Sequence, residues 1–137
     1  MKLRTIMLLW LYFPGFGEEP PSAERATVVL YRRKDYFGSD FTVKINSQAV
    51  TQRFSNNEYF RLEIPAGKIR VETEGDFITE KKSMTFTVNA NETLFLKGIV
   101  DYDYLSNALY FKRTASDQAA KEMTKLKPDE TALKKVE

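Results

Sequence analysis

The sequence of 137 residues contains no cysteine and no histidine. The lack of cysteine excludes disulfides, thiolate nucleophiles and cysteine-ligated zinc. The lack of histidine excludes Ser-His-Asp and Cys-His catalytic sites and removes the commonest metal ligand. Paired carboxylates, Ser-Lys pairs and tyrosine remain as possible catalytic groups, but their spacing forms no recognisable motif. We therefore expect a protein that is not an enzyme, with no catalytic residues, no cofactor and no metal site.

A long apolar run is also missing. The longest, Thr5–Phe13, has about nine residues, whereas a membrane-spanning helix needs about twenty. Lys2 and Arg4 precede this run, and Pro14 breaks any helix after it. Positive charge, a short apolar run and small residues up to position 17 are the pattern of a secretory signal. We expect residues 1–17 to be a signal that is removed on export to the periplasm or cell envelope, which leaves no transmembrane anchor. The alternative is an apolar first strand or a buried helix.

The apparent basic surplus lies in this same segment. The whole chain has 21 basic and 19 acidic residues, a formal net charge of +2. Residues 1–17 hold two of the basic residues and no acidic one, so the remaining chain has 19 of each. Nucleic-acid binding normally needs a basic surplus that displaces counterions from phosphates. We therefore expect no nucleic-acid partner.

Short runs of alternating apolar and polar residues fill the middle of the sequence, with turn residues between them. This alternation is typical of half-buried strands, and the close spacing of turns favours a sandwich or barrel. We predict an all-β fold, an antiparallel β-sandwich of about seven or eight strands, over residues 26–126, after a linker at 18–25. The expected strands are Ala26–Arg32, Phe41–Ile45, Val50–Phe54, Phe60–Ile64, Lys68–Thr73, Met84–Val88, Thr93–Val100 and Ala108–Arg113.

One short helix is expected near the C-terminus. Apolar residues recur there at spacings of four and three, at Ala119, Met123 and Leu126. Thr114 or Ser116 is a suitable N-cap, and Pro128 ends the pattern. Residues 127–137 are rich in charge, and we expect them to form a flexible tail.

The stretches Val28–Arg32, Phe37–Ser39, Phe41–Asn46 and Tyr59–Lys68 resemble, in order and spacing, the bacterial domain-of-unknown-function (DUF) family numbered 2846. The resemblance extends over about 100 residues, from Ala26 to Leu126. It implies a β-sandwich in a small envelope protein on the outer side of the inner membrane, and it implies no catalytic residues. Many members carry a lipidated cysteine at the end of the signal. The present chain has none, so we expect no anchoring through cysteine.

A candidate binding site follows the first expected strand. Arg32 leads into Tyr36, Phe37, Gly38 and Ser39, which place a cation and two aromatic rings beside a flexible glycine. The rings suit stacking on a sugar or on a partner chain. The alternative is an ordinary strand end and turn, with Phe37 folded onto the core.

Aromatic residues also fall on the strands, some of them opposite the clearest apolar rows, at Tyr31, Tyr59, Phe95 and Tyr110. We expect them to lie under the C-terminal helix. The alternative is an exposed aromatic patch that binds a partner.

The leading functional hypothesis is a non-catalytic exported envelope module that binds a protein or glycan partner. One alternative is a structural or assembly protein that pairs through strand edges. A carboxylate-based hydrolase is a further alternative, with Glu58, Glu63 and Glu72 as candidate residues.

Overall fold

The computed structural model describes residues 24–35, 40–75, 79–102 and 106–136. The expected signal at 1–17 lies outside the described residues, as do most of the expected linker and the candidate binding residues Tyr36, Phe37, Gly38 and Ser39. Within the described part of the chain, no helix is long and apolar enough to cross a membrane.

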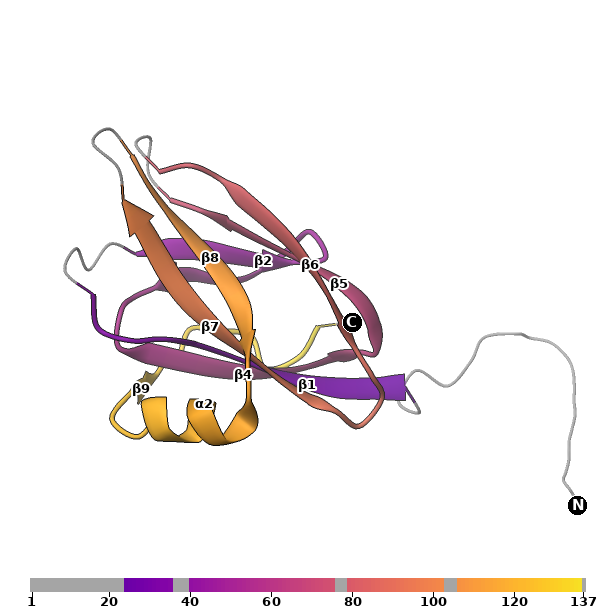
Figure 1. Cartoon of the computed structure of the whole chain (residues 1–137). Coiled ribbons are helices and arrows are strands. Elements are labelled where there is room, and N and C mark those ends of the chain that lie inside the picture. The colour runs from indigo at the N-terminus through magenta and orange to yellow at the C-terminus, as the bar shows by residue number, and fades with distance from the viewer. Residues whose placement is uncertain (1–23, 36–39, 76–78, 103–105, 137) are drawn as a thin grey trace, which may run out of the picture.

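Two sheets face each other and form a sandwich (Figure 1). In spatial order, the first sheet consists of β8 (Asn107–Thr114), β7 (Thr93–Tyr102), β1 (Arg25–Arg32), β4 (Glu58–Pro65) and the two-residue β9 (Lys127–Pro128). The second consists of β3 (Gln48–Phe54), β2 (Phe41–Ile45), β5 (Gly67–Glu74) and β6 (Lys82–Val88). The expected all-β sandwich is confirmed, and the ends of the eight long strands differ by at most two residues from those expected.

Strand β1 is hydrogen-bonded to another strand along each of its two edges, and both of its faces are buried. It pairs antiparallel with β4 and parallel with β7, so the prediction of a purely antiparallel sheet is wrong for the β1–β7 pair. Its last five residues, 28–32, are all buried. Val28 and Leu30 belong to the core between the sheets, whereas Val29 and Tyr31 alternate onto the other face. This double burial explains the continuous apolar sequence of β1.

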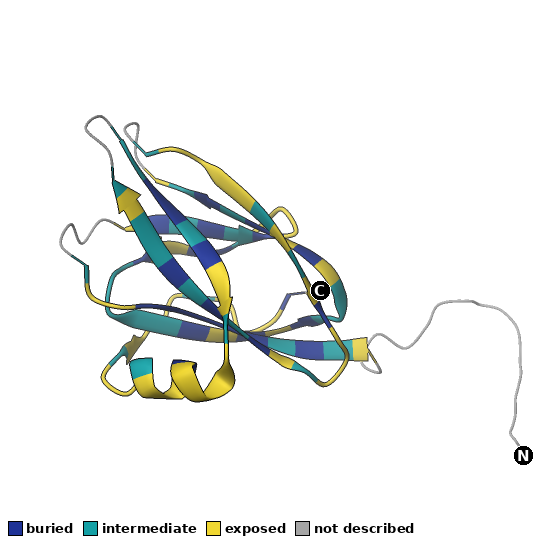
Figure 2. Ribbon diagram, in the orientation of Figure 1, coloured by how far each residue is buried: buried dark blue, intermediate teal, exposed yellow. Residues whose placement is uncertain are grey.

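The core lies between the sheets and follows the period of two that the sequence shows (Figure 2). In β2, for example, Phe41, Val43 and Ile45 are buried, and the residues between them are half-exposed. The Phe54 ring meets the Phe60 ring edge-on at a centroid distance of 5.0 Å, which joins β3 to β4 across the sandwich. Full burial of each such side chain contributes about 1.5–3 kcal/mol to the free energy of folding.

Several strands are joined by tight turns that contain residues with a positive φ angle. Asn46 and Ser47 have φ angles of 51° and 70° between β2 and β3, and Asn57 has a φ of 64° between β3 and β4. Asparagine adopts this left-handed backbone at lower cost than most residues. Gly67, the first residue of β5, has a φ of 129°, a conformation that side-chain-bearing residues rarely adopt.

Helix α2 (Ser116–Glu122) lies on the outer face of the first sheet (Figure 1). Its N-cap is Ala115, and no side chain caps it, so the expectation that Thr114 or Ser116 caps the helix is wrong. The apolar spacing predicts a helix that extends to Leu126, whereas the helix ends at Glu122 and its C-cap is Met123. Ala119 is its one buried residue.

The expected flexible tail is ordered over its described part and forms what we call the C-terminal strap, residues 127–136. Lys127 N–H donates to Asn57 O and Asp129 N–H to Tyr59 O, which hold the strap to β4. Leu133 N–H donates to Val50 O on β3, in the other sheet. Val136, 2% exposed, is part of the core. These backbone hydrogen bonds and the burial of Val136 hold the strap along the side of the sandwich formed by β3 and β4.

Candidate functional site

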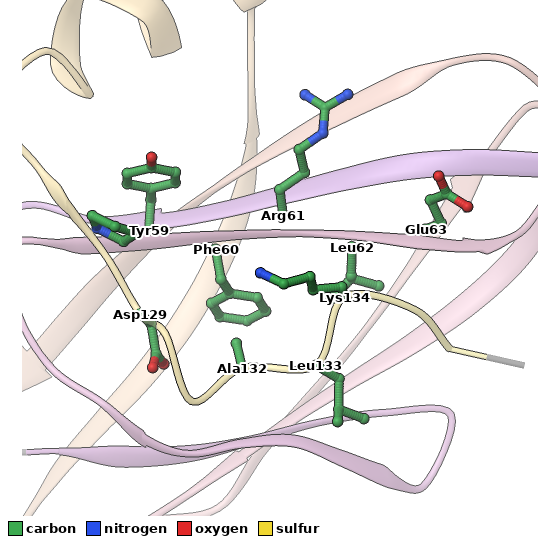
Figure 3. Close-up of a pocket in the computed structure, with 10 residues that line it drawn as sticks. Tyr59, Phe60, Arg61, Leu62, Glu63, Asp129, Ala132, Leu133 and Lys134 are labelled. Carbon is green, nitrogen blue, oxygen red and sulfur yellow. The ribbon is translucent and has the colours of Figure 1, made fainter.

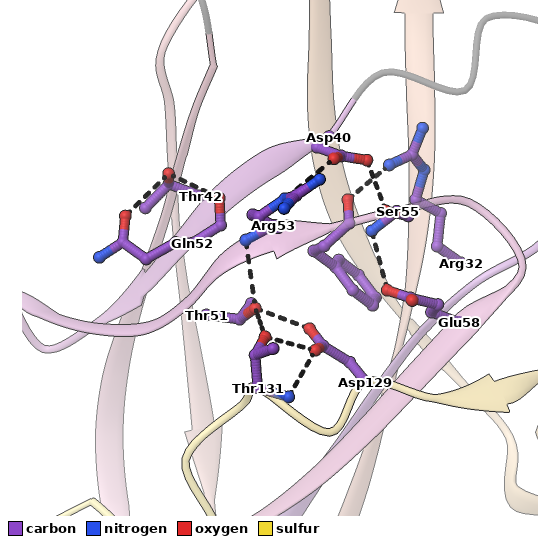
Figure 4. Close-up of polar contacts among 11 residues, drawn as sticks. Arg32, Asp40, Thr42, Thr51, Gln52, Arg53, Ser55, Glu58, Asp129 and Thr131 are labelled. Atoms are coloured by element: carbon purple, nitrogen blue, oxygen red, sulfur yellow. Dashed lines mark hydrogen bonds and ion pairs between the residues drawn. The ribbon is translucent and has the colours of Figure 1, made fainter.

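Arg32, the last residue of β1, is buried and points toward the second sheet (Figure 4). Its guanidinium donates through Nε to Asp35 Oδ2 at 2.9 Å and through Nη1 to Phe54 O at 2.7 Å. Its Cζ also lies 5.1 Å from the centroid of the Phe41 ring, a cation–π contact. The residue is completely buried, so the expectation that Arg32 contacts a partner at the surface is not met. Arg32 satisfies backbone and side-chain groups inside the protein.

A second polar network joins the strap to β3 (Figure 4). Asp129 accepts hydrogen bonds of 2.6 Å from the hydroxyls of Thr51 and Thr131, and it also accepts from Thr131 N–H at 3.0 Å. Both carboxylate oxygens are therefore occupied by groups of the protein. This arrangement stabilises the strap, and it was not predicted because Asp129 stands in a stretch that reads as solvent-exposed charge.

Glu122, the last residue of α2, joins the helix to the sheet. Its carboxylate accepts from Tyr31 Oη at 2.7 Å, Lys97 Nζ at 3.1 Å and Gln118 Nε2 at 2.6 Å. Burial raises the pKa of this group, but the three hydrogen bonds outweigh it and hold the pKa at about 2. Burial, reinforced by the bond to Glu122, raises the pKa of Tyr31 to about 12. At neutral pH neither group exchanges a proton, so the pair is suited to holding the helix in place.

The same contact bears on one of the four strand aromatics that were expected to lie under the helix. Tyr31 is fully buried beneath α2, as expected. Tyr59, Phe95 and Tyr110 are half-buried on the same outer face of the first sheet. The helix covers Tyr31 completely and leaves the other three rings partly accessible.

A basic pocket of about 630 Å³ lies where the end of β1 approaches the end of α2. We use the name basic pocket for the space lined by Arg33, Lys34, Asn57, Lys121, Glu122, Thr124, Lys125 and Leu126. Four cationic side chains face a single carboxylate, that of Glu122, which is already bonded to Tyr31 and Lys97. The pocket combines two segments far apart in sequence, which is why the sequence pattern did not reveal it. Lys34 lies two residues before Tyr36, at the start of the predicted binding loop.

A smaller pocket of about 390 Å³ lies between β4 and the strap (Figure 3). Phe60 and Leu62 point from β4 toward Ala132 and Leu133 of the strap. The charges around it are balanced, with two cations, Arg61 and Lys134, and two carboxylates, Glu63 and Asp129. This pocket lies where the strap packs against β4, and it carries no excess of positive or negative charge.

The three carboxylates considered for hydrolysis do not come together. Glu58 and Glu63 are five residues apart on β4 and so point to opposite faces, and Glu72 lies in the other sheet. Burial raises the pKa of Glu58, while a hydrogen bond from Ser55 N–H opposes this shift. Glu72 is paired with Arg70 at 3.4 Å. Among the described residues, no group of three or more Asp or Glu side chains is placed to hold a metal ion.

Comparisons with protein-family models, with curated proteins and with solved structures found no match. The resemblance to the DUF family numbered 2846 therefore stays a prediction, and a functional proposal has to be argued from the geometry of this chain.

Proposed function

We propose that the protein is a non-catalytic, exported module of the cell envelope that binds a glycan or protein partner at the end of the sandwich bearing the basic pocket. The observation that carries the proposal is the surplus of cations around this pocket, whereas the charges around the smaller pocket between β4 and the strap are balanced. The pocket volume, about 630 Å³, lies in the range of ligand sites, about 300–1,000 Å³.

The state of the buried ionisable groups supports a binding role over a catalytic one. A general acid or base works best with a pKa near the working pH. Glu122 and Tyr31 have pKa values of about 2 and 12, far on either side of neutrality. Their hydrogen bonds hold α2 against the sheet and so fix one wall of the basic pocket.

Assembly through strand edges is less well supported, because side chains and the strap cover much of these edges. On β8, Phe111 N–H faces Met84 Sδ at 3.1 Å and Leu109 O accepts from the Thr73 hydroxyl at 2.6 Å. On β3, the strap bonds to Val50 O, and on β6, Arg113 bonds to Thr87 O. Covered edges are a common defence against pairing with another chain.

Two measurements test the proposal. N-terminal sequencing of the exported protein should begin at Glu18, and a start at Met1 would contradict the cleaved signal. Immobilised full chain should retain peptidoglycan, an envelope polysaccharide or a reproducible envelope protein identified by mass spectrometry. Retention of none of these, together with concentration-dependent self-association in sedimentation, would favour the assembly role instead.

A further inference from the structure

We propose that the basic pocket binds the anionic groups, carboxylate or phosphate, of an envelope glycan. This inference rests on the proposed function and specifies its ligand class. It names the pocket cations, Arg33, Lys34, Lys121 and Lys125, as the groups that contact the ligand.

The first argument is the absence of internal partners for most of these charges. Within the part of the chain that the structure describes, the ammonium groups of Lys34, Lys121 and Lys125 have no ion pair, and Arg33 lies 3.6 Å from Glu122. Cations gathered around one hollow repel each other and raise the local positive potential. An anionic ligand relieves that repulsion and gains charge-assisted hydrogen bonds.

The second argument is that the backbone around the pocket is held by the fold. On one side, Lys127 N–H bonds to Asn57 O at 3.0 Å, which ties the β3–β4 turn to the segment after α2. On the other, Glu122 is anchored on Tyr31 and Lys97. The cations therefore extend from fixed positions, so less freedom is lost when a ligand binds.

The pocket cations could instead serve to stabilise α2, but this explanation accounts for only some of them. A lysine in the last turn interacts favourably with the negative end of a helix, and Lys121 is placed to do so. The carbonyls of Ala120 and Lys121, however, already accept hydrogen bonds from the Thr124 hydroxyl. Arg33 and Lys34 follow β1 and do not belong to the helix at all. Their position at the same hollow needs a different reason.

The chemistry of the lining favours a glycan over a protein. Protein interfaces depend on buried aromatic and apolar anchors, whereas the only apolar side chain lining this pocket in the described residues is the half-buried Leu126. Asn57 supplies an amide next to the cations. Such a mixture suits a hydrated ligand with both hydroxyl and acidic groups. Nucleic acid is disfavoured because residues 18–137 have equal numbers of basic and acidic side chains.

The test measures binding of the full chain to defined polymers by isothermal titration calorimetry. Polygalacturonate supplies carboxylates, poly(glycerol phosphate) supplies phosphates, and dextran is the neutral reference. Single-stranded DNA is the polyanion that is not a glycan. We expect binding to at least one anionic glycan that weakens steadily as salt rises, with no binding to dextran. Competition by inorganic phosphate against either polymer shows which acidic group the pocket prefers.

Two double variants with equal changes of charge locate the site. Lys121→Gln with Lys125→Gln should weaken binding about tenfold or more, because two charge-assisted contacts are lost. The control, Lys68→Gln with Lys112→Gln, removes two exposed cations on β5 and β8 that line neither of the two pockets described, and it should change affinity by less than about twofold. Circular dichroism verifies that both variants are folded.

Three results would overturn the inference: equal binding of dextran and the anionic glycans, equal losses in the two double variants, or DNA binding as tight as glycan binding. Retention of an envelope partner tests the proposed function separately from the ligand class. If both double variants still retain an envelope partner as the parent does, the module binds away from the basic pocket. The ligand assignment and the proposed location of the site then fail, and the binding role of the module stands. If the parent chain retains no partner and no polymer, both proposals fail.

Discussion

The Tyr31 hydroxyl donates a 2.7 Å hydrogen bond to Glu122 Oε1, although the two residues are 91 positions apart. Tyr31 belongs to the most enclosed strand of the molecule, and Glu122 ends the single helix of the described chain. The bond therefore connects the centre of the first sheet to the element that lines the basic pocket. Stability and ligand binding are expected to depend on the same contact.

Glu122→Gln should lower the free energy of unfolding by about 2–3 kcal/mol, because the pairing of Lys97 is lost and the bond with Tyr31 is weakened. Urea denaturation followed by circular dichroism measures this loss. Tyr31→Phe removes a single hydrogen bond and should cost less, about 1–2 kcal/mol. Glu130→Gln, at an exposed position of the strap, is the matched control and should lie within about 0.5 kcal/mol of the parent. Equal effects of the two glutamate variants would contradict the role of Glu122.

The stabilisation by Glu122 should disappear in acid. The pKa of this group is about 2 in the folded protein and about 4.5 as the ordinary value, so the unfolded state binds more protons between these values. Stability from Glu122 is then fully present above pH 4.5 and is lost as the pH falls toward 2. Denaturation of the parent and of Glu122→Gln between pH 7 and pH 2 measures this. The stability difference between them should shrink over that window, and a constant difference would contradict the assignment.

The strap should contribute to the stability of the whole domain. Val136→Ala should cost about 1–2 kcal/mol, because Val136 is buried in the core between the sheets. Leu133→Ala removes a larger side chain that is 37% exposed, and it should cost less. Thermal and urea unfolding of the two variants give the comparison. A greater loss for Leu133→Ala would mean that the strap does not pack as described.

Arg32→Lys should destabilise the protein even though the charge is kept. The guanidinium reaches Asp35 and Phe54 O at the same time, whereas one ammonium group lacks this forked geometry. We expect a loss of about 2 kcal/mol in the free energy of unfolding. Arg53→Lys is the control, because the Arg53 side chain is 77% exposed, and it should be nearly neutral. No difference between the two variants in urea denaturation would contradict the internal role of Arg32.

Most strands were predictable because they bury one face, and the alternation of Phe41, Val43 and Ile45 reports this directly. The parallel pairing of β1 with β7 was not predictable, since the choice of neighbouring strand depends on contacts between distant segments. Asp129 and Glu122 look like ordinary surface charges in sequence, yet both are enclosed by hydroxyl or amine donors from other elements. The basic pocket escaped prediction for the same reason, because only half of its cations stand near the predicted loop.

The late positions of β7 and the strap in the sequence also affect the rate of folding. Strand β1 must wait for Thr93–Gly98 before its second edge is paired, and the bonds of Lys134 and Val136 to Glu63 of β4 form only after those strap residues are made. Contacts between such distant segments slow folding, because a long loop must close before they form. The domain is therefore expected to stay unfolded until the strap has been synthesised. This delay is compatible with passage of the chain through an export channel as an extended polypeptide.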